Sequence, residues 1–258
     1  MRWRLPPLPF VEERHVALAH AVAQWCDEHR ALLEAPDTGD FAARCRAIVR
    51  CLAQAGLLDH VLPPGEAKGQ TRFDMRAICV VREGLAYESN LAASLFAIQG
   101  MGLSPLFRFD RPDLRDRYVP RARAGESISA IAISEAQGGS DVGAIATRAV
   151  RDGDAYRISG EKMWIANGGF ADHFLVLARS ETSSGRRAFS AFLIDSDLPG
   201  VVRGPDIGMI DGFPLATVAF EDVRVPASRL VGKPGDGMKA AMAGFDLFRP
   251  SVGAAALG

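Results

Sequence analysis

The chain of 258 residues lacks an excess of charge of either sign, long apolar runs and more than a few cysteines. Lysine and arginine number 30 against 31 aspartates and glutamates, so no electrostatic footprint for nucleic acid or an anionic membrane is present. No uninterrupted apolar segment approaches the roughly 20 residues that cross a bilayer. The opening MRWRLPPLPF lacks the apolar core of a secretory signal. We therefore expect a cytoplasmic protein that binds neither nucleic acid nor a membrane.

The scarce cysteines and histidines exclude further classes of site. The four cysteines, Cys26, Cys45, Cys51 and Cys79, form no CxxC motif, which favours reduced thiols in the core over a metal or redox site. The five histidines show no metal-ligand spacing either, and no metal is predicted. The remaining composition, 48% hydrophobic and 24% charged, is that of a globular protein with one large or two modest domains.

Residues 1–125 have the apolar spacing of helices. Side chains recur at steps of three and four in two stripes: Leu18, Val22 and Trp25, then Phe41, Cys45, Ile48, Leu52 and Ala55. Asp40, Asp74 and Asn90 are placed to open helices, and Pro112 suits a first helical turn. Pro120 discourages continuation of that last helix. The sequence thus predicts an N-terminal all-α domain.

From residue 126 onward, short β-branched and aromatic runs alternate with turn signals. Strands are predicted near Ser127–Ile133, Ala144–Val150, Ala155–Ser159, His173–Leu177, Ala188–Asp195 and Thr217–Val223. Short strands at this spacing indicate a small β-barrel or sandwich, which we assign to residues 126–232. A helical pattern resumes at Gly237, so residues 233–258 are the start of a C-terminal helical region. The predicted fold class is α+β.

Two segments carry the functional signal. Residues 131–141 read IAISEAQGGSD, a strand that ends in a small, polar turn. Its glycines and hydroxyls can approach a flat polar ring or a phosphate closely. Residues 160–169 read GEKMWIANGG, in which Trp164 offers a planar face beside a turn that tolerates positive φ. Taken singly, the glycines fit a tight loop, Ser134 a capping hydroxyl and Trp164 a core aromatic. Taken together, they suit a flat heteroaromatic cofactor.

Together the two segments resemble the flavin-contacting core of the acyl-CoA dehydrogenase family. In that family the first reads Thr-Glu-Pro-x-Ala-Gly-Ser-Asp and the second Gly-x-Lys-x-Trp-Ile-Thr/Ser-Asn-Gly. Further landmarks are Ala55-Gly56-Leu57, Arg117-Tyr118-Val119-Pro120, the run from Phe220 to Pro226 and the run from Phe245 to Pro250, so the resemblance covers most of the chain. It implies FAD as cofactor and an acyl-CoA as substrate.

The resemblance also implies roles for individual residues. Backbone groups of Ile131 and Ile133 and the Ser134 hydroxyl would meet the flavin ring, and Trp164 would lie on the flavin face. Ile165 and Ala166 continue the flavin-contacting segment. Ser140 would bond a cofactor phosphate or the pantetheine arm.

On the substrate side, Asp246 and Arg249 match the family's CoA-side pair; the alternative is an ion pair on a helix surface. Gln99 follows an apolar run and is expected at the base of the acyl pocket, although a polar residue at a helix end needs no function.

Several departures from the family keep alternatives open. Ala166 stands where the family has Thr or Ser, which removes a hydrogen bond of order 1 kcal/mol, and Ala136-Gln137 replace Pro and a small residue. The catalytic glutamate of the family lies in a later helical bundle, or in some branches at the position of Phe248. The catalytic residue of this chain is therefore unknown.

We expect α,β-dehydrogenation of an acyl-CoA to a trans-2-enoyl-CoA, with electrons passed to an electron-transfer flavoprotein. A homo- or hetero-oligomeric partner chain, or a C-terminal region, would supply the base and the missing bundle. The alternatives are a non-catalytic flavin- or acyl-CoA-binding subunit, and another flavoenzyme, an oxidase or monooxygenase, on the same fold.

Overall fold

The computed structural model describes residues 3–6, 8–35, 40–64, 73–109, 111–180, 188–209 and 213–258. Its helices are α1 Glu13–Glu28, α2 Arg30–Leu33, α3 Phe41–Gln54, α4 Met75–Glu88, α5 Asn90–Met101, α6 Pro105–Arg108, α7 Pro112–Arg123 and α8 Gly237–Leu257. Its strands are β1 Ser129–Ala132, β2 Arg148–Asp152, β3 Ala155–Ala166, β4 His173–Ser180, β5 Phe189–Asp195, β6 Val201–Ile207, β7 Leu215–Pro226 and β8 Leu230–Val231. The chain therefore has the predicted α+β order.

The predicted helices form where their apolar stripes and caps place them. Val22 and Trp25 are buried on α1, and Cys45, Ile48 and Leu52 are buried on α3. The two predicted aspartate caps are also present. Asp40 accepts a hydrogen bond from the Ala43 amide at 2.9 Å, and Asp74 accepts one from the Arg76 amide at 3.1 Å. Local sequence signals were sufficient for these helices.

Two helix boundaries differ from the prediction. Ser89, not Asn90, caps α5, because its hydroxyl accepts a hydrogen bond from the Ala92 amide at 3.3 Å. Helix α7 runs through Pro120 and ends at Arg123, so this proline does not stop it. Proline removes only one backbone donor, and Gly125, with φ 71°, follows the end of the helix two residues later.

The strands form one connected sheet in the order β6-β7-β3-β2-β4-β5-β8, with β1 paired to β4. One edge of β4 pairs with β5; the other pairs with β1 near its beginning, at His173–Val176, and with β2 near its end, at Arg179–Ser180. Because β1 and β2 pair with different parts of the same edge of β4, the sheet does not continue as one flat layer. This places β1 against β3, although the two strands are not paired.

Two strands were missing from the prediction. Strand β6 pairs only with β7 at the edge of the sheet, and it contains Gly204 and Pro205, which weaken a strand signal. Strand β8 has two residues, Leu230 and Val231, and pairs with β5. Both depend on a neighbouring strand more than on their own composition.

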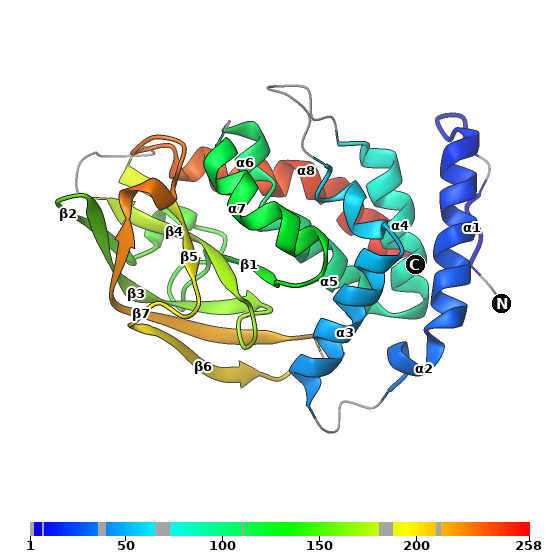
Figure 1. Cartoon of the computed structure of the whole chain (residues 1–258), viewed down its shortest axis with the longest axis horizontal. Coiled ribbons are helices and arrows are strands. Elements are labelled where there is room, and N and C mark those ends of the chain that lie inside the picture. The colour runs from blue at the N-terminus through cyan, green and yellow to red at the C-terminus, as the bar shows by residue number, and fades with distance from the viewer. Residues whose placement is uncertain are drawn as a thin grey trace.

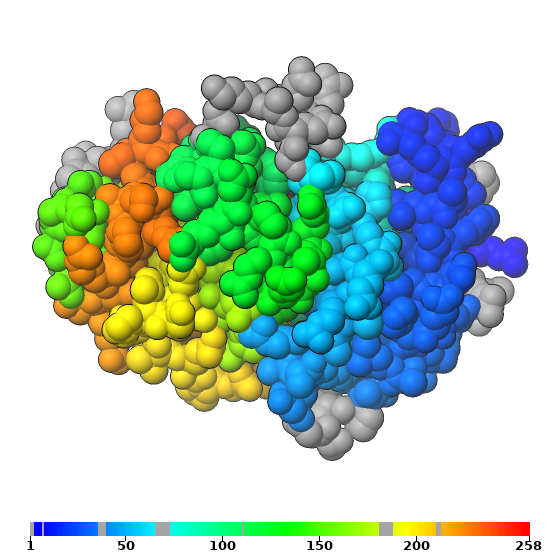
Figure 2. All heavy atoms as spheres, viewed as in Figure 1, coloured from blue at the N-terminus to red at the C-terminus, as the bar shows by residue number. Residues whose placement is uncertain are grey.

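Helices and strands pack into one body (Figure 1). Helices α1 to α5 lie at one end and the strands at the other, and α8 runs from the strands back to the helices. In Figure 2, α6 and α7 (green) are seated between the N-terminal helices (blue and cyan) and the strands (yellow and orange). A single cluster of buried apolar side chains runs from α1 to α8. The sheet and the helices therefore share one core.

The stretch Asn90–Arg108 is apolar and long enough to pass as a membrane span, contrary to the expectation from the sequence. Its 18-residue window is 83% buried inside the chain, and its mean hydropathy is only 1.2. Burial of this kind identifies a core helix, since α5 is surrounded by α3, α4, α8 and β1.

The four cysteines form no disulfide within the residues that the structure describes. Cys26 and Cys45 are buried, whereas Cys51 and Cys79 are half-buried. Burial raises the pKa of the Cys79 thiol, which keeps it protonated at neutral pH.

Gly160 provides a test of how closely β3 approaches the turn before β2. Its φ is +152°, and a Cβ there would lie 2.6 Å from the Thr147 Cα and closer still to the Thr147 hydroxyl. Gly153 has φ +59°, but a Cβ added there would meet no atom within 4 Å. We expect Gly160→Ala to lower the free energy of unfolding by about 2 kcal/mol more than Gly153→Ala, because only the first adds a backbone clash to positive φ. Urea unfolding would measure both, and equal costs would contradict the described packing.

Candidate functional site

The two motif segments of the sequence meet in the structure. The Lys162 ammonium donates to the Ile133 carbonyl at 3.0 Å, and the Met163 amide donates to the Ser134 carbonyl at 2.9 Å. Directly after β3, the Asn167 side-chain amide donates to the Ser129 carbonyl at 3.0 Å. Strand β3 is thus fastened to β1 and the residues after it along the whole length of the predicted site.

A buried ion pair joins the segments. Lys162 is fully buried, and its Nζ lies 2.8 Å from Oε1 of Glu135, whose side chain is 3% exposed. Burial alone would raise the pKa of Glu135, but hydrogen bonds from Lys162, Thr147 and the Ala146 amide together lower it to about 2. Burial lowers the pKa of Lys162 to about 8, against the opposing effect of Glu135. Both groups are therefore charged at neutral pH.

Glu135 also closes the loop that carries the polar turn. Its carboxylate accepts hydrogen bonds from the Ala146 amide at 2.6 Å, the Thr147 amide at 3.0 Å and the Thr147 hydroxyl at 2.5 Å. The Gln137 side chain donates to it as well, at 2.6 Å. One carboxylate therefore fixes both the beginning and the end of the loop from 135 to 147.

Trp164 is held in an unusual backbone conformation. Its φ is 62°, in the left-handed region, and its side chain is 52% exposed. The cause is a β-bulge: β3 pairs with β7 through Lys162↔Val218 and again through Ile165↔Ala216, which leaves two residues of β3 opposite one of β7. Such a conformation costs about 1–3 kcal/mol and persists only where the surroundings enforce it. The core-aromatic alternative for Trp164 is thus wrong.

The polar turn presents unused hydroxyls. Ser134 is half-buried and Ser140 is exposed, and neither side chain makes a hydrogen bond to another residue within the described part of the chain. A Cβ at Gly139 would meet nothing within 4 Å, whereas one at Gly138 would lie 3.2 Å from the Asp141 carbonyl. A side chain at Gly138 would therefore be tight against the turn, and Gly139 leaves open space beside it.

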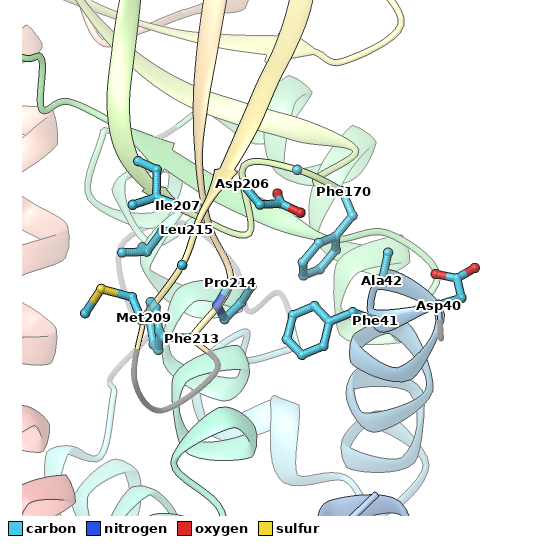
Figure 3. A pocket seen from close by; sticks show the side chains of 12 residues that line it. Asp40, Phe41, Ala42, Phe170, Asp206, Ile207, Met209, Phe213, Pro214 and Leu215 are labelled. Atoms are coloured by element: carbon cyan, nitrogen blue, oxygen red, sulfur yellow. The ribbon is translucent and has the colours of Figure 1, made fainter. Parts of the chain in front are cut away.

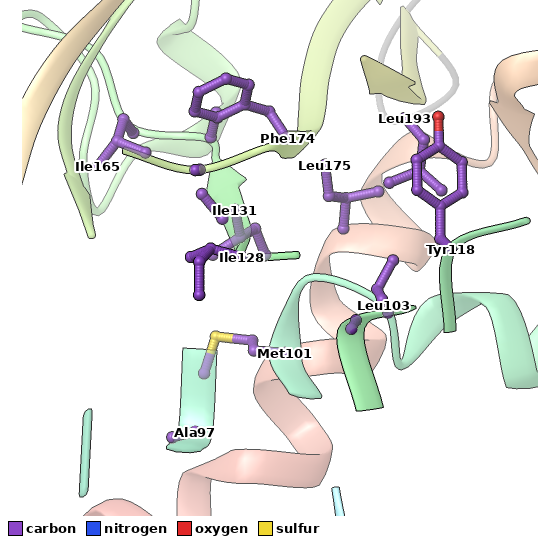
Figure 4. Close-up of a cluster of buried hydrophobic side chains, with 14 of the residues drawn as sticks. Ala97, Met101, Leu103, Tyr118, Ile128, Ile131, Ile165, Phe174, Leu175 and Leu193 are labelled. Atoms are coloured by element: carbon purple, nitrogen blue, oxygen red, sulfur yellow. The ribbon is translucent and has the colours of Figure 1, made fainter. Parts of the chain in front are cut away.

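The other predicted flavin contacts lie at the inner side of the same segments. The side chains of Ile131, Ile133 and Ile165 are buried, and Figure 4 shows Ile131 and Ile165 within a cluster of buried apolar side chains. Only their backbone groups can face a ligand, and the Ile133 carbonyl is already bonded to Lys162. Ala166 is half-buried and pairs with Leu215 of β7.

Gln99 has contacts that contradict a place in an acyl pocket. It is fully buried; its Nε2 donates to the Ala122 carbonyl at 2.9 Å and to the Ser127 carbonyl at 2.5 Å, and its Oε1 accepts from the Ser129 amide at 3.0 Å. Both donor hydrogens and the carbonyl are engaged with backbone. Gln99 therefore joins α5 to the end of α7 and to β1, a role in the framework rather than in substrate contact.

Asp246 and Arg249 are both exposed on α8, one helical turn apart. They form no ion pair with each other within the ranges that the structure describes, so the surface-pair alternative is not realised. Asp246 lines a cavity of about 560 Å³ together with Arg108, Lys233 and Lys239. Arg249 is not among the residues that line it. The predicted pair is thus divided, with only Asp246 facing this cavity.

Phe248 occupies the core beneath these two residues. It is fully buried, and a Cβ at Gly100 of α5 would come within 2.6 Å of its ring. A phenyl ring in contact with α5 offers no proton acceptor. No catalytic base is therefore supplied at this position.

A separate cavity of about 580 Å³ lies between the start of α3 and the β6–β7 connection. Figure 3 shows Phe41 and Phe170 at one side of it, with the Asp206 carboxylate nearby and Pro214 opposite. None of the residues predicted to contact flavin or substrate lines it, so this cavity and the motif site do not coincide.

The sequence interpretation did not predict the contact between Glu135 and Lys162, although both stand in the quoted motifs. The sequence did contain a signal for this ion pair. Tyr156, Ile158 and Lys162 share one face of β3 by the period of two, and that face is apolar. A lysine on the buried face of a strand requires an anionic partner.

Comparison with known proteins matches two family models: acyl-CoA dehydrogenase, N-terminal domain, over residues 12–126, and acyl-CoA dehydrogenase, middle domain, over residues 130–223. Cyclohexane-1-carbonyl-CoA dehydrogenase of Geobacter metallireducens is 36% identical over 217 residues, covering 82% of this chain and 56% of that protein. A probable acyl-CoA dehydrogenase of Mycobacterium leprae is 34% identical over 237 residues, covering 89% of this chain and 60% of that one. The chain thus spans little more than half the length of these relatives.

Solved structures that resemble this chain are also described as acyl-CoA dehydrogenases. A Bacillus anthracis acyl-CoA dehydrogenase complexed with FAD has a TM-score of 0.84 at 26% identity, covering 95% of this chain and 43% of that chain. A protein from Mycobacterium smegmatis described as an acyl-CoA dehydrogenase has a TM-score of 0.83 at 26% identity, covering 96% and 65%.

The Glu135–Lys162 pair should dominate the acid sensitivity of the domain. The pKa of Glu135 falls from 4.5 to about 2 on folding, so its stabilisation is complete above pH 4.5 and is lost as the pH falls towards 2. Glu135→Gln should cost about 3 kcal/mol or more at pH 7, because it leaves Lys162 buried without an anion. Urea unfolding from pH 7 to pH 3 should show the two proteins converging on acidification. A constant difference would contradict the pair, and Glu135→Gln/Lys162→Met should recover part of the loss.

The backbone at Trp164 can be tested separately. Because Trp164 has positive φ and an exposed side chain, Trp164→Gly should be more stable than Trp164→Ala by about 1 kcal/mol. At Val150, exposed in the regular strand β2, the same comparison should favour alanine. Thermal unfolding of the four variants would measure this, and the same sign at both positions would exclude the left-handed conformation.

Proposed function

Because this chain belongs to the acyl-CoA dehydrogenase family, we propose that it forms the flavin-facing part of an FAD-dependent acyl-CoA dehydrogenase. The reaction is the α,β-dehydrogenation of an acyl-CoA thioester to a trans-2-enoyl-CoA, with an electron-transfer flavoprotein as electron acceptor. The named relatives support this proposal, and they are nearly twice as long as this chain.

The single observation that supports flavin binding best is Trp164. A large indole, 52% exposed and locked in a strained backbone, has no structural benefit that a smaller residue would not give. A planar ligand that stacks on the indole would bury this surface. The Ser134 carbonyl bonds directly to the residue before Trp164, so the unused Ser134 hydroxyl lies close by. These groups fit a flavin.

The chemistry divides between cofactor and chain. Bound FAD would accept a hydride from the β-carbon of the substrate. The residues of this chain would hold and orient the ring through Trp164, Ser134 and backbone groups of Ile131, Ile133, Ile165 and Ala166. Ser140, exposed at the tip of the polar turn, would bond a phosphate or the pantetheine arm.

Cationic residues beside Asp246 suit the CoA end of the substrate. Arg108, Lys233 and Lys239 line the same cavity of about 560 Å³, and their charges would attract the phosphates of CoA. Asp246 and the Lys239 ammonium lie on α8, where Lys239 already pairs with Asp236 at 3.2 Å. Arg249, exposed one turn further on, would contact CoA only from outside this cavity.

The catalytic base would come from outside the described residues, since buried Phe248 stands where some members carry it. One feature of α8 supports a covering polypeptide, either further chain or a partner in a homo- or hetero-oligomer: its apolar side chains Val252 and Leu257 are 51% and 80% exposed. Helix α8 is itself held to α4, because Arg82 donates to the Ser251 hydroxyl at 2.9 Å.

The lack of a base at Phe248 also favours one second candidate, a non-catalytic subunit that binds flavin or acyl-CoA. Both candidates predict ligand binding at the same residues. Only the first predicts that a bound acyl-CoA is oxidised.

FAD binding can be followed through Trp164. Trp3 and Trp25 are 8% and 4% exposed, so a stacked flavin should quench mainly the Trp164 emission, and this change should be absent in Trp164→Phe. Anaerobic addition of a panel of acyl-CoA esters, to the chain alone and with candidate partner chains, should bleach the flavin absorbance. If FAD binds and no ester bleaches it, the non-catalytic role is supported. If FAD does not bind in any preparation, the flavoenzyme proposal is wrong.

A further inference from the structure

We infer that the buried pair Glu135–Lys162 is a positioning device: it holds β3 in the bulge that turns Trp164 outward and keeps Ser134 beside it. The link to flavin rests on the proposed function. The effect on the Trp164 backbone does not, because it follows from contacts within the chain.

The alternation along β3 shows what the bulge achieves. Tyr156, Ile158 and Lys162 are buried at even positions, and in an unbroken strand Trp164 would follow them into the core. After the bulge, Ile165 and Asn167 are buried instead, at odd positions. A shift of one residue exchanges the two faces of a strand. The outward indole is therefore a direct consequence of the bulge.

The bulge is fastened on both sides to the β1 segment. On the near side, Lys162 bonds the Ile133 carbonyl and Glu135, and the next residue, Met163, bonds the Ser134 carbonyl in place of β7. On the far side, Asn167, with φ 63°, bonds the Ser129 carbonyl. Between these anchors the chain has one residue more than β7 can pair, and Trp164 adopts positive φ to accommodate it.

The near anchor depends on opposite charges. A lysine ammonium remains in an apolar interior only where an anion and hydrogen-bond acceptors compensate for lost water. Glu135 is that anion, and four further donors from the loop 135–147 hold its carboxylate in place. Without it, Lys162 would turn towards solvent, and the Met163–Ser134 hydrogen bond would lose its support. Loss of Glu135 would therefore free both the Trp164 side chain and Ser134 from their present positions.

The experiment uses acrylamide quenching of tryptophan fluorescence in the full chain. Because Trp3 and Trp25 are buried, the quenching reports Trp164. In Glu135→Gln/Lys162→Met, which removes both charges while keeping similar side-chain sizes, we expect the quenching constant of Trp164 to change by about twofold or more as the left-handed conformer becomes a minority. FAD affinity, measured with any partner chain that the wild type requires, should fall about tenfold for the same reason.

Asp172→Asn is the matched control. Asp172 pairs with Arg46 of α3 at 2.8 Å and accepts the Ile128 amide at 2.7 Å, so it fastens the opposite end of β1 without touching β3. Asp172→Asn should lower the free energy of unfolding. It should leave Trp164 quenching and FAD affinity within about twofold of the wild type, because a change in stability alone does not move a folded site. If the double variant does not fold, Lys162→Met gives the same comparison, because Glu135 keeps its hydrogen bonds from the loop 135–147.

The outcomes separate the inference from the proposed function. If the wild type binds FAD, and the double variant matches it in both quenching and affinity, the inference is wrong and the proposed function stands. If the double variant and Asp172→Asn change Trp164 quenching equally, the pair is only structural, and the inference is again wrong. If the wild type binds no FAD, the proposed function is wrong, while the quenching comparison still decides whether the pair sets the Trp164 backbone.

Discussion

The buried contact between Lys162 and Glu135 is the interaction on which the candidate site depends. It joins strand β3 to the segment after β1, although the sheet itself does not pair them. Through the loop amides and the Thr147 hydroxyl, the same carboxylate fixes the polar turn that carries Ser140. Removing a charge pair of this kind from water is costly, and it is retained where its geometry is needed. Here the geometry is that of the surface around Trp164.

The site combines a rigid framework with an exposed ligand face. Gln99, Asp172 and Asn167 each bond backbone groups of β1 or the residue before it, so this strand is positioned from α5, from the loop before β4 and from β3. Such support allows strain to persist at Trp164, because relaxing it would break several neighbouring contacts. A site on this framework needs little rearrangement to receive a planar ligand, which agrees with a cofactor that stays bound.

The predicted substrate side is less complete. Helix α8 carries the exposed Asp246 and Arg249 and the buried Phe248, and its last turns expose the apolar side chains of Val252 and Leu257. Helices gain most of their stability from packing of an apolar face. A covering polypeptide would therefore both stabilise this end of the chain and provide a place for a base, which links assembly to activity in the proposed enzyme.

The sequence by itself determined the order of helices and strands, the aspartate caps at Asp40 and Asp74, and the two motifs that indicate a flavin, because these depend on local periodicity, turn chemistry and spacing. It placed Gln99 in a pocket and left Trp164 open to a core reading, because both depend on partners distant in the chain. Only the tertiary structure showed that Gln99 bonds three backbone groups and that Trp164 faces outward. The physical reason is register: one additional residue in β3 reverses which side chains are buried, and long-range contacts with β1 decide where it is accommodated.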